Sequence, residues 1–500
     1  MEKLFSAVTS DSVTIYWDKS EKAGKHWRYE IIVDENKVGE TDRTHFCIEG
    51  LSPEREYDIR VEASDGLTIV GCCEKSIIIL KKKKKLDITL APYGAIGDGE
   101  YMNTRAIQQA IDDCGPEDMV YIPAGIFKTG ALRLHSDMEL YLEEGAVLLG
   151  TENPEDYLPR IKSRFEGIEM ECYSSLLNIG TLDHEAGYLC ENVLIRGKGT
   201  IESGGAQLAK NIIDSEGKRL KDYLEGLGSK IDEYENQNTI PGRVRPRLIN
   251  ISNCRNVRIS GLALKNGASW NVHMVYSDQI LTDNCSFYSQ GIWNGDGWDP
   301  DSSTNCTIFG CTFYTEDDSI AIKSGKNPEG NVIGRPCEHI RIFDCVCAFG
   351  HGFAIGSEIS GGINDIRIWD CNLINSRYGI QIKGTPKRGG FVRNVTMWDC
   401  QVSRVLMHSV SYNDDGKATP KPPVFEQCRF ERMQIMGKCL SEEGNDYHSC
   451  PAIKLKGFDL PGHEIRGVTF KDIAIGCGEG SKEIILENCR NVTFEQIHTE

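Results

Sequence analysis

The sequence predicts an all-β protein in which an N-terminal β-sandwich precedes a right-handed parallel β-helix. Three observations indicate this fold class. Short segments of alternating polar and apolar residues fill the first part of the chain, a strand pattern recurs from residue 254 onward, and few segments have helical spacing. Alternation with a period of two is typical of strands, and repeats at unequal intervals are typical of coils whose turns vary in length. We therefore expect two domains, residues 1–86 and 87–500.

The composition is that of a globular, acidic chain. Of 500 residues, 40% are hydrophobic and 26% are charged, and the formal net charge is −18. This charge argues against a nucleic-acid partner. No apolar stretch approaches the roughly 20 residues that span a bilayer, so we expect no membrane partner. The first residues, MEKLFSAVTSDSVTIYWD, do not combine a basic segment with a continuous apolar core, which leads us to expect a cytoplasmic location.

The N-terminal part has the pattern of short antiparallel strands. Apolar residues alternate in three segments, namely Val13, Ile15 and Trp17; Ile31 and Val33; and Ile59 and Val61. The segment LSPEREY, residues 51–57, resembles the tyrosine corner of fibronectin type III domains, and Trp17 suits their buried tryptophan. Because this part shows no catalytic cluster, we expect a structural or positioning domain. The lysine run at residues 81–85 is interpreted as a solvated linker, with contact to a polyanion as the alternative.

The second part opens with a short helix. In the segment NTRAIQQAIDDC, four apolar residues have helical spacing: Ala106, Ile107, Ala110 and Ile111. Asn103 or Thr104 is the expected N-cap, because a short polar side chain before the first turn can accept a hydrogen bond from a free backbone N–H. The sequence therefore predicts one helix before the repeats begin.

The repeats predict successive coils of the β-helix. They include CRNVRIS, TNCTIFGC, CEHIRIFDC, INDIRIWDC and VRNVTMWDC. With the repeat that contains Ile280 included, their first apolar positions are Val257, Ile280, Cys306, Ile340, Ile366 and Val395. Successive positions are separated by 23, 26, 34, 26 and 29 residues. Five positions after the last five anchors come cysteines, which we expect to form an interior ladder: Cys285, Cys311, Cys345, Cys371 and Cys400. A ladder of metal ligands is the alternative, but no matching set of histidines accompanies it.

Asp317 and Asp318 stand side by side in YTEDDSIAIKSG, directly before an apolar run. A plain strand would bury one of them, which is costly for a lone carboxylate, so we expect a bend that turns both outward. Asp296 lies 21 residues before Asp317, close to one coil, and His351 and Lys383 follow in later coils. The crowding keeps one carboxylic acid protonated while its neighbours stay charged. Such a set suits hydrolysis of a glycosidic bond with inversion, because the acid protonates the leaving oxygen while carboxylates activate water.

Residues 87–500 resemble glycoside hydrolase family 28, the polygalacturonases. The resemblance begins at YGAIGDGEYMNTRAIQQAIDDC and is strongest through NGDGWDPDSS, EDDSIAIKSG, GHGFAIGSEISGG and IKGTPKRGG. The fibronectin-like domain and the segments GSEISGG and KRGG are similar to the exo-acting bacterial members. Within NGDGWDPDSS, Asp299 and Asp301 are interpreted as caps of β-helix turns.

The resemblance implies roles for individual residues. Asp317 would be the general acid, and Asp296 and Asp318 would share activation of the attacking water. His351 would tune the acid or hold the local hydrogen bonds, and Lys383 would bind a galacturonate carboxylate. The resemblance implies no metal and no other cofactor.

One departure concerns the residue two positions before the binding lysine. The family usually carries arginine there, whereas this chain has Gln381. Glutamine cannot supply the charge of an arginine fork, so either another arginine binds the sugar carboxylate or the sugar is not plain galacturonate. Arg388, in KRGG, and Arg245, in RVRPRLIN, are further candidate substrate-binding residues, with an ordinary surface charge as the alternative for Arg388. Arg164, in SRFEGIE, lies in another segment that resembles a binding motif.

We therefore predict an inverting, exo-acting hydrolase of α-1,4-linked galacturonate in pectic oligosaccharides. One alternative is a family 28 hydrolase of rhamnogalacturonan or of otherwise modified pectin fragments. A pectate lyase would share the β-helix, but lyases of that fold usually use calcium and an arginine base. A carbohydrate-binding solenoid without activity would not need the three aspartates together.

Overall fold

The structure is a computed structural model that describes residues 3–23, 27–234, 236–410 and 417–499. It divides into two compact units. The first comprises Met1–Lys85 and Gly115–Met119, and the second comprises Leu86–Cys114 and Val120–Glu500.

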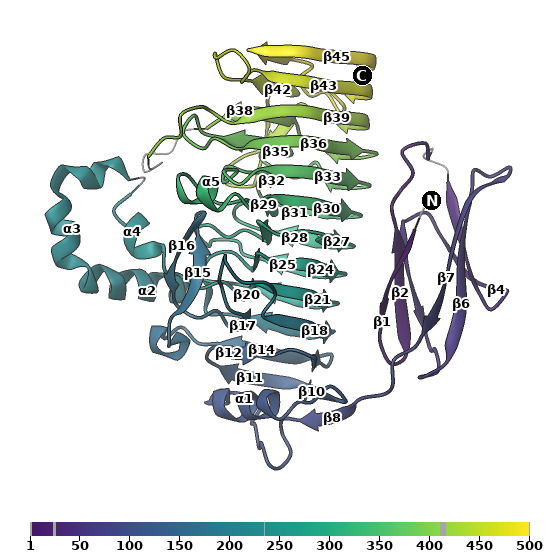
Figure 1. The fold of residues 1–500 in the computed structure, drawn as a ribbon, viewed down its shortest axis with the longest axis vertical. Coiled ribbons are helices and arrows are strands. Elements are labelled where there is room, and N and C mark those ends of the chain that lie inside the picture. Colours follow the sequence, from purple (N-terminus) through teal and green to yellow (C-terminus); the bar gives the residue numbers. More distant parts are fainter. Residues whose placement is uncertain (1–2, 24–26, 235, 411–416, 500) are drawn as a thin grey trace. The chain divides into compact units, whose positions relative to one another are not determined.

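The first unit contains two antiparallel sheets, as expected for a fibronectin type III-like sandwich (Figure 1). One sheet has the order β1 (Leu4–Val8), β2 (Ser12–Trp17), β5 (His45–Glu49); the other has the order β4 (Asn36–Thr41), β3 (Arg28–Val33), β6 (Glu56–Ser64), β7 (Ile69–Ile78). Trp17 is buried in the core of this unit. The Tyr57 hydroxyl accepts a hydrogen bond from the backbone N–H of Ser52 at 2.9 Å, which confirms the predicted tyrosine corner.

The second unit is the predicted right-handed parallel β-helix, whose coils stack one on the next in Figure 1. Three parallel ladders run along it, and the first two belong to one 23-stranded sheet. The strands of the first ladder are β10 (Asp118–Ile122), β13 (Met138–Leu142), β18 (Cys190–Gly197), β21 (Cys254–Ser260), β24 (Asp278–Asp283), β27 (Thr307–Phe309), β30 (Cys337–Phe343), β33 (Ile363–Trp369), β36 (Phe391–Trp398), β39 (Val424–Ile435), β43 (Ile465–Ile475) and β45 (Cys489–Thr499). The second ladder contains β11 (Gly125–Thr129), β14 (Ala146–Gly150), β19 (Thr200–Glu202), β22 (Ala263–Lys265), β25 (Ser286–Tyr288), β28 (Thr312–Tyr314), β31 (Val346–Phe349), β34 (Asn372–Leu373) and β37 (Gln401–Val402).

The third ladder is an 11-stranded sheet that leads to the candidate site. Its strands are β12 (Leu132–Leu134), β17 (Leu177–Gly180), β20 (Ile249–Ser252), β23 (Val272–Val275), β26 (Trp298–Asp301), β29 (Ile320–Ile322), β32 (Phe353–Ile355), β35 (Ile380–Gly384), β38 (Val405–Ser409), β42 (Ile453–Lys456) and β44 (Ile484–Glu487). The strands β8 (Lys84–Asp87) and β9 (Asp98–Met102) extend the 23-stranded sheet by pairing with β10 and β11. Outside the ladders lie the hairpins β15 (Ile161–Phe165) with β16 (Ile168–Cys172) and β40 (Lys438–Leu440) with β41 (Tyr447–Ser449).

The register of the first ladder confirms the repeat anchors. Val257 pairs with Ile280, Ile340 with Ile366, and Ile366 with Val395. The five cysteines of the predicted ladder are all buried and free, and consecutive members touch: the backbone N–H of Cys285 lies 3.4 Å from the Cys311 sulfur. Apolar side chains at the same position of successive coils therefore stack inside the β-helix, and their packing favours this register.

The helices agree with the sequence in part. Helix α1 (Thr104–Asp112) buries Ile107, Ala110 and Ile111 as predicted, and Asn103 is its N-cap residue. The predicted cap bond is wrong, because the Asn103 side chain bonds to the backbone of Ile96 instead. No element was predicted for the segment that forms α2 (Gly205–Arg219), α3 (Lys221–Leu227) and the 3-10 helix η2 (Gly228–Glu233).

The remaining helical elements are short. They are α4 (Thr239–Gly242), α5 (Glu329–Ile333) and the 3-10 helix η1 (Pro154–Tyr157). Within the described ranges, no helix combines the length and the apolar character needed to cross a bilayer.

Candidate active site

The predicted acidic residues and His351 lie in the turns that lead into the third ladder. In this ladder three residues on successive coils are register partners: Trp298, Ile320 and Phe353. Two positions before them come Asp296, Asp318 and His351. Backbone hydrogen bonds join the turns, since Gly297 donates to the Asp318 carbonyl at 3.0 Å and His351 donates to the Asp317 carbonyl at 3.0 Å. The structure therefore brings together the residues that the coil spacing predicted to be neighbours.

Two lysines occupy equivalent register positions at the other end of these strands. Lys323 comes three residues after Ile320, and Lys383 comes three residues after Ile380 two coils further on. The coil between them has Gly356 at this position, with a φ of 97°. A Cβ there would overlap the carbonyl oxygen of Lys383, and the positive φ also favours glycine. The two lysines are thus separated by a coil that has no side chain at this point.

We call the group of Asp317, Asp318, His351 and Lys383 the open cluster. His351 Nδ1 lies 2.8 Å from Asp317 Oδ1 and 3.5 Å from Asp318 Oδ1. Lys383 Nζ donates to Asp318 Oδ2 at 2.9 Å. The side chains of Asp317 and His351 keep 27% and 21% of their exposure. Solvent, and hence a ligand, can reach the acid and the imidazole.

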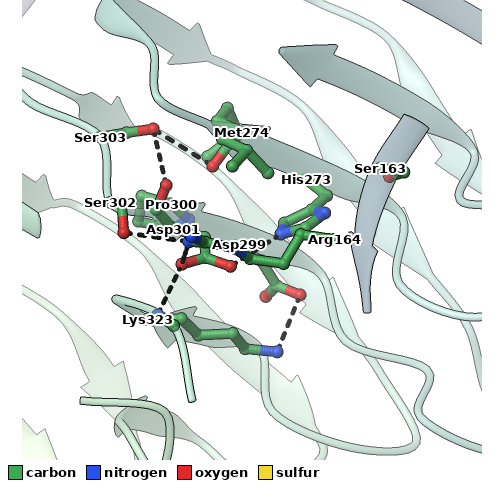
Figure 2. Close-up of polar contacts among 12 residues, drawn as sticks. Ser163, Arg164, His273, Met274, Asp299, Pro300, Asp301, Ser302, Ser303 and Lys323 are labelled. Atoms are coloured by element: carbon green, nitrogen blue, oxygen red, sulfur yellow. Dashed lines mark hydrogen bonds and ion pairs between the residues drawn. The ribbon is translucent and has the colours of Figure 1, made fainter. Parts of the chain in front are cut away.

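We call the group of Asp296, Asp299 and Lys323 the closed cluster. Lys323 Nζ donates to Asp296 Oδ2 at 2.9 Å and to Asp299 Oδ2 at 3.3 Å. Figure 2 shows the lysine extending toward Asp299, and its Nζ lies 3.7 Å from the centre of the Trp270 ring. The side chains of Lys323, Asp296 and Asp299 are only 4, 5 and 0% exposed. The ammonium is therefore compensated within the protein, as a buried charge requires.

Asp301 belongs to a second buried ion pair beside the closed cluster (Figure 2). Arg164 Nη1 donates to Asp301 Oδ1 at 2.8 Å, and His273 Nε2 lies 3.4 Å from Asp301 Oδ2. The interpretation of the two strand aspartates as turn caps is wrong for Asp299, which compensates Lys323. It is incomplete for Asp301, which accepts one backbone N–H, at 3.1 Å, but also pairs with Arg164. Both residues lie inside β26, where no solvent screens them.

The partners within the open cluster favour a charged Asp317. Burial raises the pKa of Asp317, but attraction to His351, the hydrogen bond from His351 and the charge of Lys383 outweigh burial and hold this pKa well below its usual range. Burial lowers the pKa of His351, and attraction to Asp317 outweighs it, so the pKa of His351 is raised to about 9. Charge on either member of the Asp317–His351 pair thus favours charge on the other.

The closed cluster has the opposite tendency. Burial raises the pKa of Asp296 well above its ordinary value and that of Asp299 to about 7, while Lys323 opposes both shifts. Two carboxyl groups share one ammonium, so this pair holds a proton more readily than a free aspartate does. These pKa shifts favour a proton on the Asp296–Asp299 pair and a charged Asp317. The predicted roles are the reverse, because in them Asp317 carries the transferable proton. Those roles therefore require a ligand that raises the pKa of Asp317.

Gln381 lies on the strand of Lys383 but binds a protein partner. Its Nε2 lies 2.6 Å from Nε2 of His408 on the next coil. Burial and the nearby cation Lys383 lower the pKa of His408 to about 4, so the imidazole is neutral and can accept this hydrogen bond. The Gln381 side chain is buried, and its Oε1 has no partner among the described residues. Gln381 and His408 thus form a neutral pair on β35, the strand of Lys383, and on the neighbouring strand β38.

Arg245 and Arg388 are both buried. Arg245 donates to the carbonyl oxygens of Gly242, Ala268 and Trp293 and to Asn294 Oδ1, at 2.6–3.2 Å. Burial lowers the pKa of Arg245 to about 9.

These contacts change how the two arginines can act. Arg388 Nη1 donates to Asn327 Oδ1 at 2.9 Å and its Nε donates to the Ser357 carbonyl at 3.0 Å. Arg245 fixes the segment just before Asp296 and Arg388 fixes the segment around Ser357. The predicted direct contact of Arg245 with substrate is thus replaced by a positioning contact, and Arg388 is not the ordinary surface charge of the alternative.

The sequence reasoning missed Lys323 and Arg377. Lys323 ends the segment IAIK, and Lys383 ends the similar segment IQIK, so comparison of these two strand ends would have placed both lysines at one register position. Arg377 Nη1 donates to His351 Nε2 at 3.1 Å. The sequence contains no signal for this contact, because Arg377 lies in a turn, SRYG, whose path it does not determine.

Three possible metal-ligand atoms in the open cluster lie within 4.8 Å of one another, on Asp317, Asp318 and His351. A metal ligand needs the lone pair of its ring nitrogen. His351 Nδ1, however, faces two carboxylate oxygens, an arrangement that places a proton there. The observed contacts thus use these atoms for hydrogen bonds, and we assign no metal to them.

Comparison with known proteins places the chain in a family. Residues 190–497 match the model of glycosyl hydrolases family 28, and residues 3–69 match that of the fibronectin type III domain. The exo-poly-alpha-D-galacturonosidase of Dickeya chrysanthemi is 27% identical over 82% of this chain and 71% of its own. A probable polygalacturonase of Vitis vinifera is 33% identical over 61% of this chain and 59% of its own.

Two solved structures share the fold. The family 28 exopolygalacturonase of Yersinia enterocolitica superposes over 100% of this chain and 97% of its own, with a TM-score of 0.82 and 23% identity. The exopolygalacturonase of Thermotoga maritima covers 83% of this chain and 92% of its own, with a TM-score of 0.68 and 25% identity. These likenesses confirm the predicted fold, and the family match covers more than half of the chain. The chain therefore belongs to family 28 of the glycosyl hydrolases and is a glycoside hydrolase.

Proposed function

We propose that this hydrolase cleaves α-1,4-linked galacturonate from one end of pectic oligosaccharides, with inversion. The observation that carries the proposal is the assembly of Asp296, Asp317 and Asp318 in adjacent turns, next to a lysine that can bind a sugar carboxylate. The similarity to the Dickeya exo-poly-alpha-D-galacturonosidase over 82% of the chain supports a galacturonate substrate and an exo mode of action.

Substrate binding at Lys383 supplies the change that the general acid needs. Lys383 is one of the cations that lower the pKa of Asp317. A galacturonate carboxylate bound to Lys383 neutralises this cation and adds a negative charge nearby. Both effects raise the pKa of Asp317. Binding of the correct, negatively charged sugar thereby favours the protonated form of the acid.

The reaction then divides between the two clusters. Asp317 donates its proton to the glycosidic oxygen as the bond to the anomeric carbon breaks. Water attacks that carbon from the opposite face and loses a proton to Asp296 or Asp318. Lys323 holds the Asp296 carboxylate in place at 2.9 Å, where it can accept that proton. The product has inverted configuration.

The pair of Gln381 and His408 favours a second candidate substrate. Where a family arginine would add a second cation beside Lys383, this pair is neutral. Compared with such a cation, a neutral pair loses less binding free energy when the sugar carries a methyl ester or is rhamnose. A rhamnogalacturonan fragment or otherwise modified pectin is therefore the second substrate class to test.

Products from a panel of defined oligosaccharides test the proposal. We expect galacturonate oligomers labelled at one end to be shortened stepwise from a single end, and proton NMR to show the inverted anomer first. Random internal cleavage would contradict the proposed exo action. A product with retained configuration would contradict the roles assigned to the aspartates. A product absorbing as a 4,5-unsaturated sugar would indicate a lyase.

A further inference from the structure

Arg377 approaches His351 on the side of the ring opposite to Asp317. Its Nη1 lies 3.1 Å from His351 Nε2, whereas Nδ1 of the same ring faces Asp317 and Asp318. A guanidinium group has N–H donors and no acceptor. This contact is therefore a hydrogen bond only when His351 Nε2 accepts, that is, when the ring is neutral with its one proton on Nδ1.

The protein holds Arg377 in this position. Its guanidinium also donates to the carbonyl oxygens of Ser441, Glu442 and Glu316, and it lies 3.6 Å from Glu316 Oε1. Ser441 and Glu442 belong to the turn between β40 and β41. Arg377 cannot turn away from the imidazole without breaking these contacts.

The Asp317–His351 pair has two places for its next proton. On Asp317 the proton creates the general acid, while on His351 Nε2 it creates an imidazolium beside a charged Asp317. The two carboxylates favour the second form. Arg377 opposes it, because a protonated Nε2 would face an N–H donor and a permanent positive charge.

We propose that Arg377 is a positioning residue that keeps His351 neutral, so that the proton of the Asp317–His351 pair resides on Asp317, where it can be donated. This inference rests on the proposed function, in which Asp317 is the acid. Arg377 acts through His351 and does not touch the reacting atoms. Besides Asp317, Asp318 and Arg377, the ring of Tyr378 faces the imidazole, at 4.9 Å between centres.

Four proteins test the proposal: the parent, Arg377→Gln, Arg377→Lys and Arg404→Gln. The lysine variant keeps a cation and a donor and should rescue part of the effect. Arg404 is the matched control, because it lies over the Tyr378 ring at 5.1 Å and does not bond to His351 in the part of the chain that the structure describes. In each protein, ¹⁵N NMR of histidine-labelled samples follows the tautomer and charge of His351 against pH, with His351→Gln used to assign its signal.

We expect His351 of the parent and of Arg404→Gln to stay neutral with Nδ1 protonated at the pH of activity. In Arg377→Gln it should be an imidazolium at that pH. An imidazolium in the parent overturns the proposal. This readout needs no turnover, so it remains decisive even when the parent proves inactive on pectic oligosaccharides and the proposed function fails.

Activity supplies the second readout. General acid catalysis contributes about 10²–10⁴-fold, so Arg377→Gln should lose at least about 10-fold in kcat/KM on oligogalacturonate. The basic limb of its pH profile should move to higher pH, since the pair binds its proton more tightly on the histidine. An aryl galacturonide with a good leaving group needs no protonation and should lose much less. Equal losses on both substrates, with an unmoved pH limb, would show a merely structural role and overturn the proposal.

Discussion

Lys323 and Lys383 occupy the same register position two coils apart, yet their surroundings differ. Lys323 has two carboxylates and an aromatic ring as partners and is 4% exposed, whereas Lys383 bonds to Asp318 and is 11% exposed. The neighbours of Lys383 include the two most accessible groups of the site, Asp317 and His351. Position in the coil thus places a cation near the acids, and the exposure of the groups around that cation distinguishes a buried ion pair from a group beside which a ligand can bind.

The largest expected effect comes from removing the proton of the open cluster. Asp317→Asn keeps the shape of the side chain but cannot act as an acid. Turnover of oligogalacturonate should fall about 10²–10⁴-fold, while the melting temperature stays close to that of the parent. The measurement is kcat on a defined oligomer together with thermal unfolding.

Asp365→Asn is the matched control for this variant. Asp365 forms a similar pair, with His339 Nδ1 at 2.7 Å, on β33 of the first ladder. It should leave turnover unchanged, because it lacks the neighbouring carboxylates of the open cluster. A loss below tenfold in Asp317→Asn would show that another residue is the acid.

The second prediction compares the two lysines directly. Lys323→Met leaves two buried carboxylates without their cation, and breaking a buried pair costs about 3–5 kcal/mol. Lys383→Met should cost less stability than Lys323→Met, because Asp318 keeps His351 as a second partner at 3.5 Å, but it removes the ligand for the sugar carboxylate and should raise KM. Urea unfolding of the β-helix unit and steady-state kinetics measure the two effects. Equal destabilisation in both variants would remove the distinction between open and closed clusters.

The sequence predicted the apolar interior of the β-helix better than the positions of its long cationic side chains. Val257, Ile280 and the later anchors fell into register because an apolar side chain must point inward and each coil repeats that requirement. The neighbourhood of Asp296 and Asp318 followed from the same spacing.

Long cationic side chains carried no such constraint. Arg245, Arg388 and Arg377 reach carbonyl groups of turns whose paths depend on segments distant in sequence. Their burial could therefore not be read from local alternation. Helices α2 and α3 were missed because they lie in an insertion between strands β19 and β20, where the repeat pattern gives no information.

The third prediction uses pH to separate the buried aspartates. The pKa of Asp299 in the folded protein is about 7, above its ordinary value of 3.8, so the folded state binds the extra proton more tightly than the unfolded state. Stability from this group is full below about pH 4 and is lost as pH rises toward 7, by a few kcal/mol at about 1.4 kcal/mol per pKa unit. For Asp301, burial raises the pKa but attraction to Arg164 outweighs it and lowers the pKa, so its contribution is present above pH 3.8 and is lost in acid.

Unfolding free energies of the parent, Asp299→Asn and Asp301→Asn between pH 4 and 8 check these signs. Relative to Asp299→Asn, the parent should lose stability as pH rises across this range. Relative to Asp301→Asn, its advantage should stay nearly constant there and should shrink only when the same measurement is extended below pH 4. A parent that gains stability relative to Asp299→Asn on raising the pH would mean that Asp299 is fully charged beside Lys323.

The smallest expected effect concerns Gln381, which lies on the same strand as Lys383 and whose side-chain amide is bonded to His408. Gln381→Arg adds a cation beside Lys383, and a charge-assisted bond is roughly twice as strong as a neutral one. Unmodified oligogalacturonate should therefore gain over methyl-esterified or rhamnose-containing fragments by about 5–10-fold in kcat/KM, which corresponds to about 1–1.4 kcal/mol. Gln381→Met separates the two causes, because it breaks the bond to His408 without adding charge and should leave the preference unchanged. An arginine variant whose preference stays that of the parent, or moves toward the neutral sugar, would show that this position acts on His408 alone and does not face the substrate.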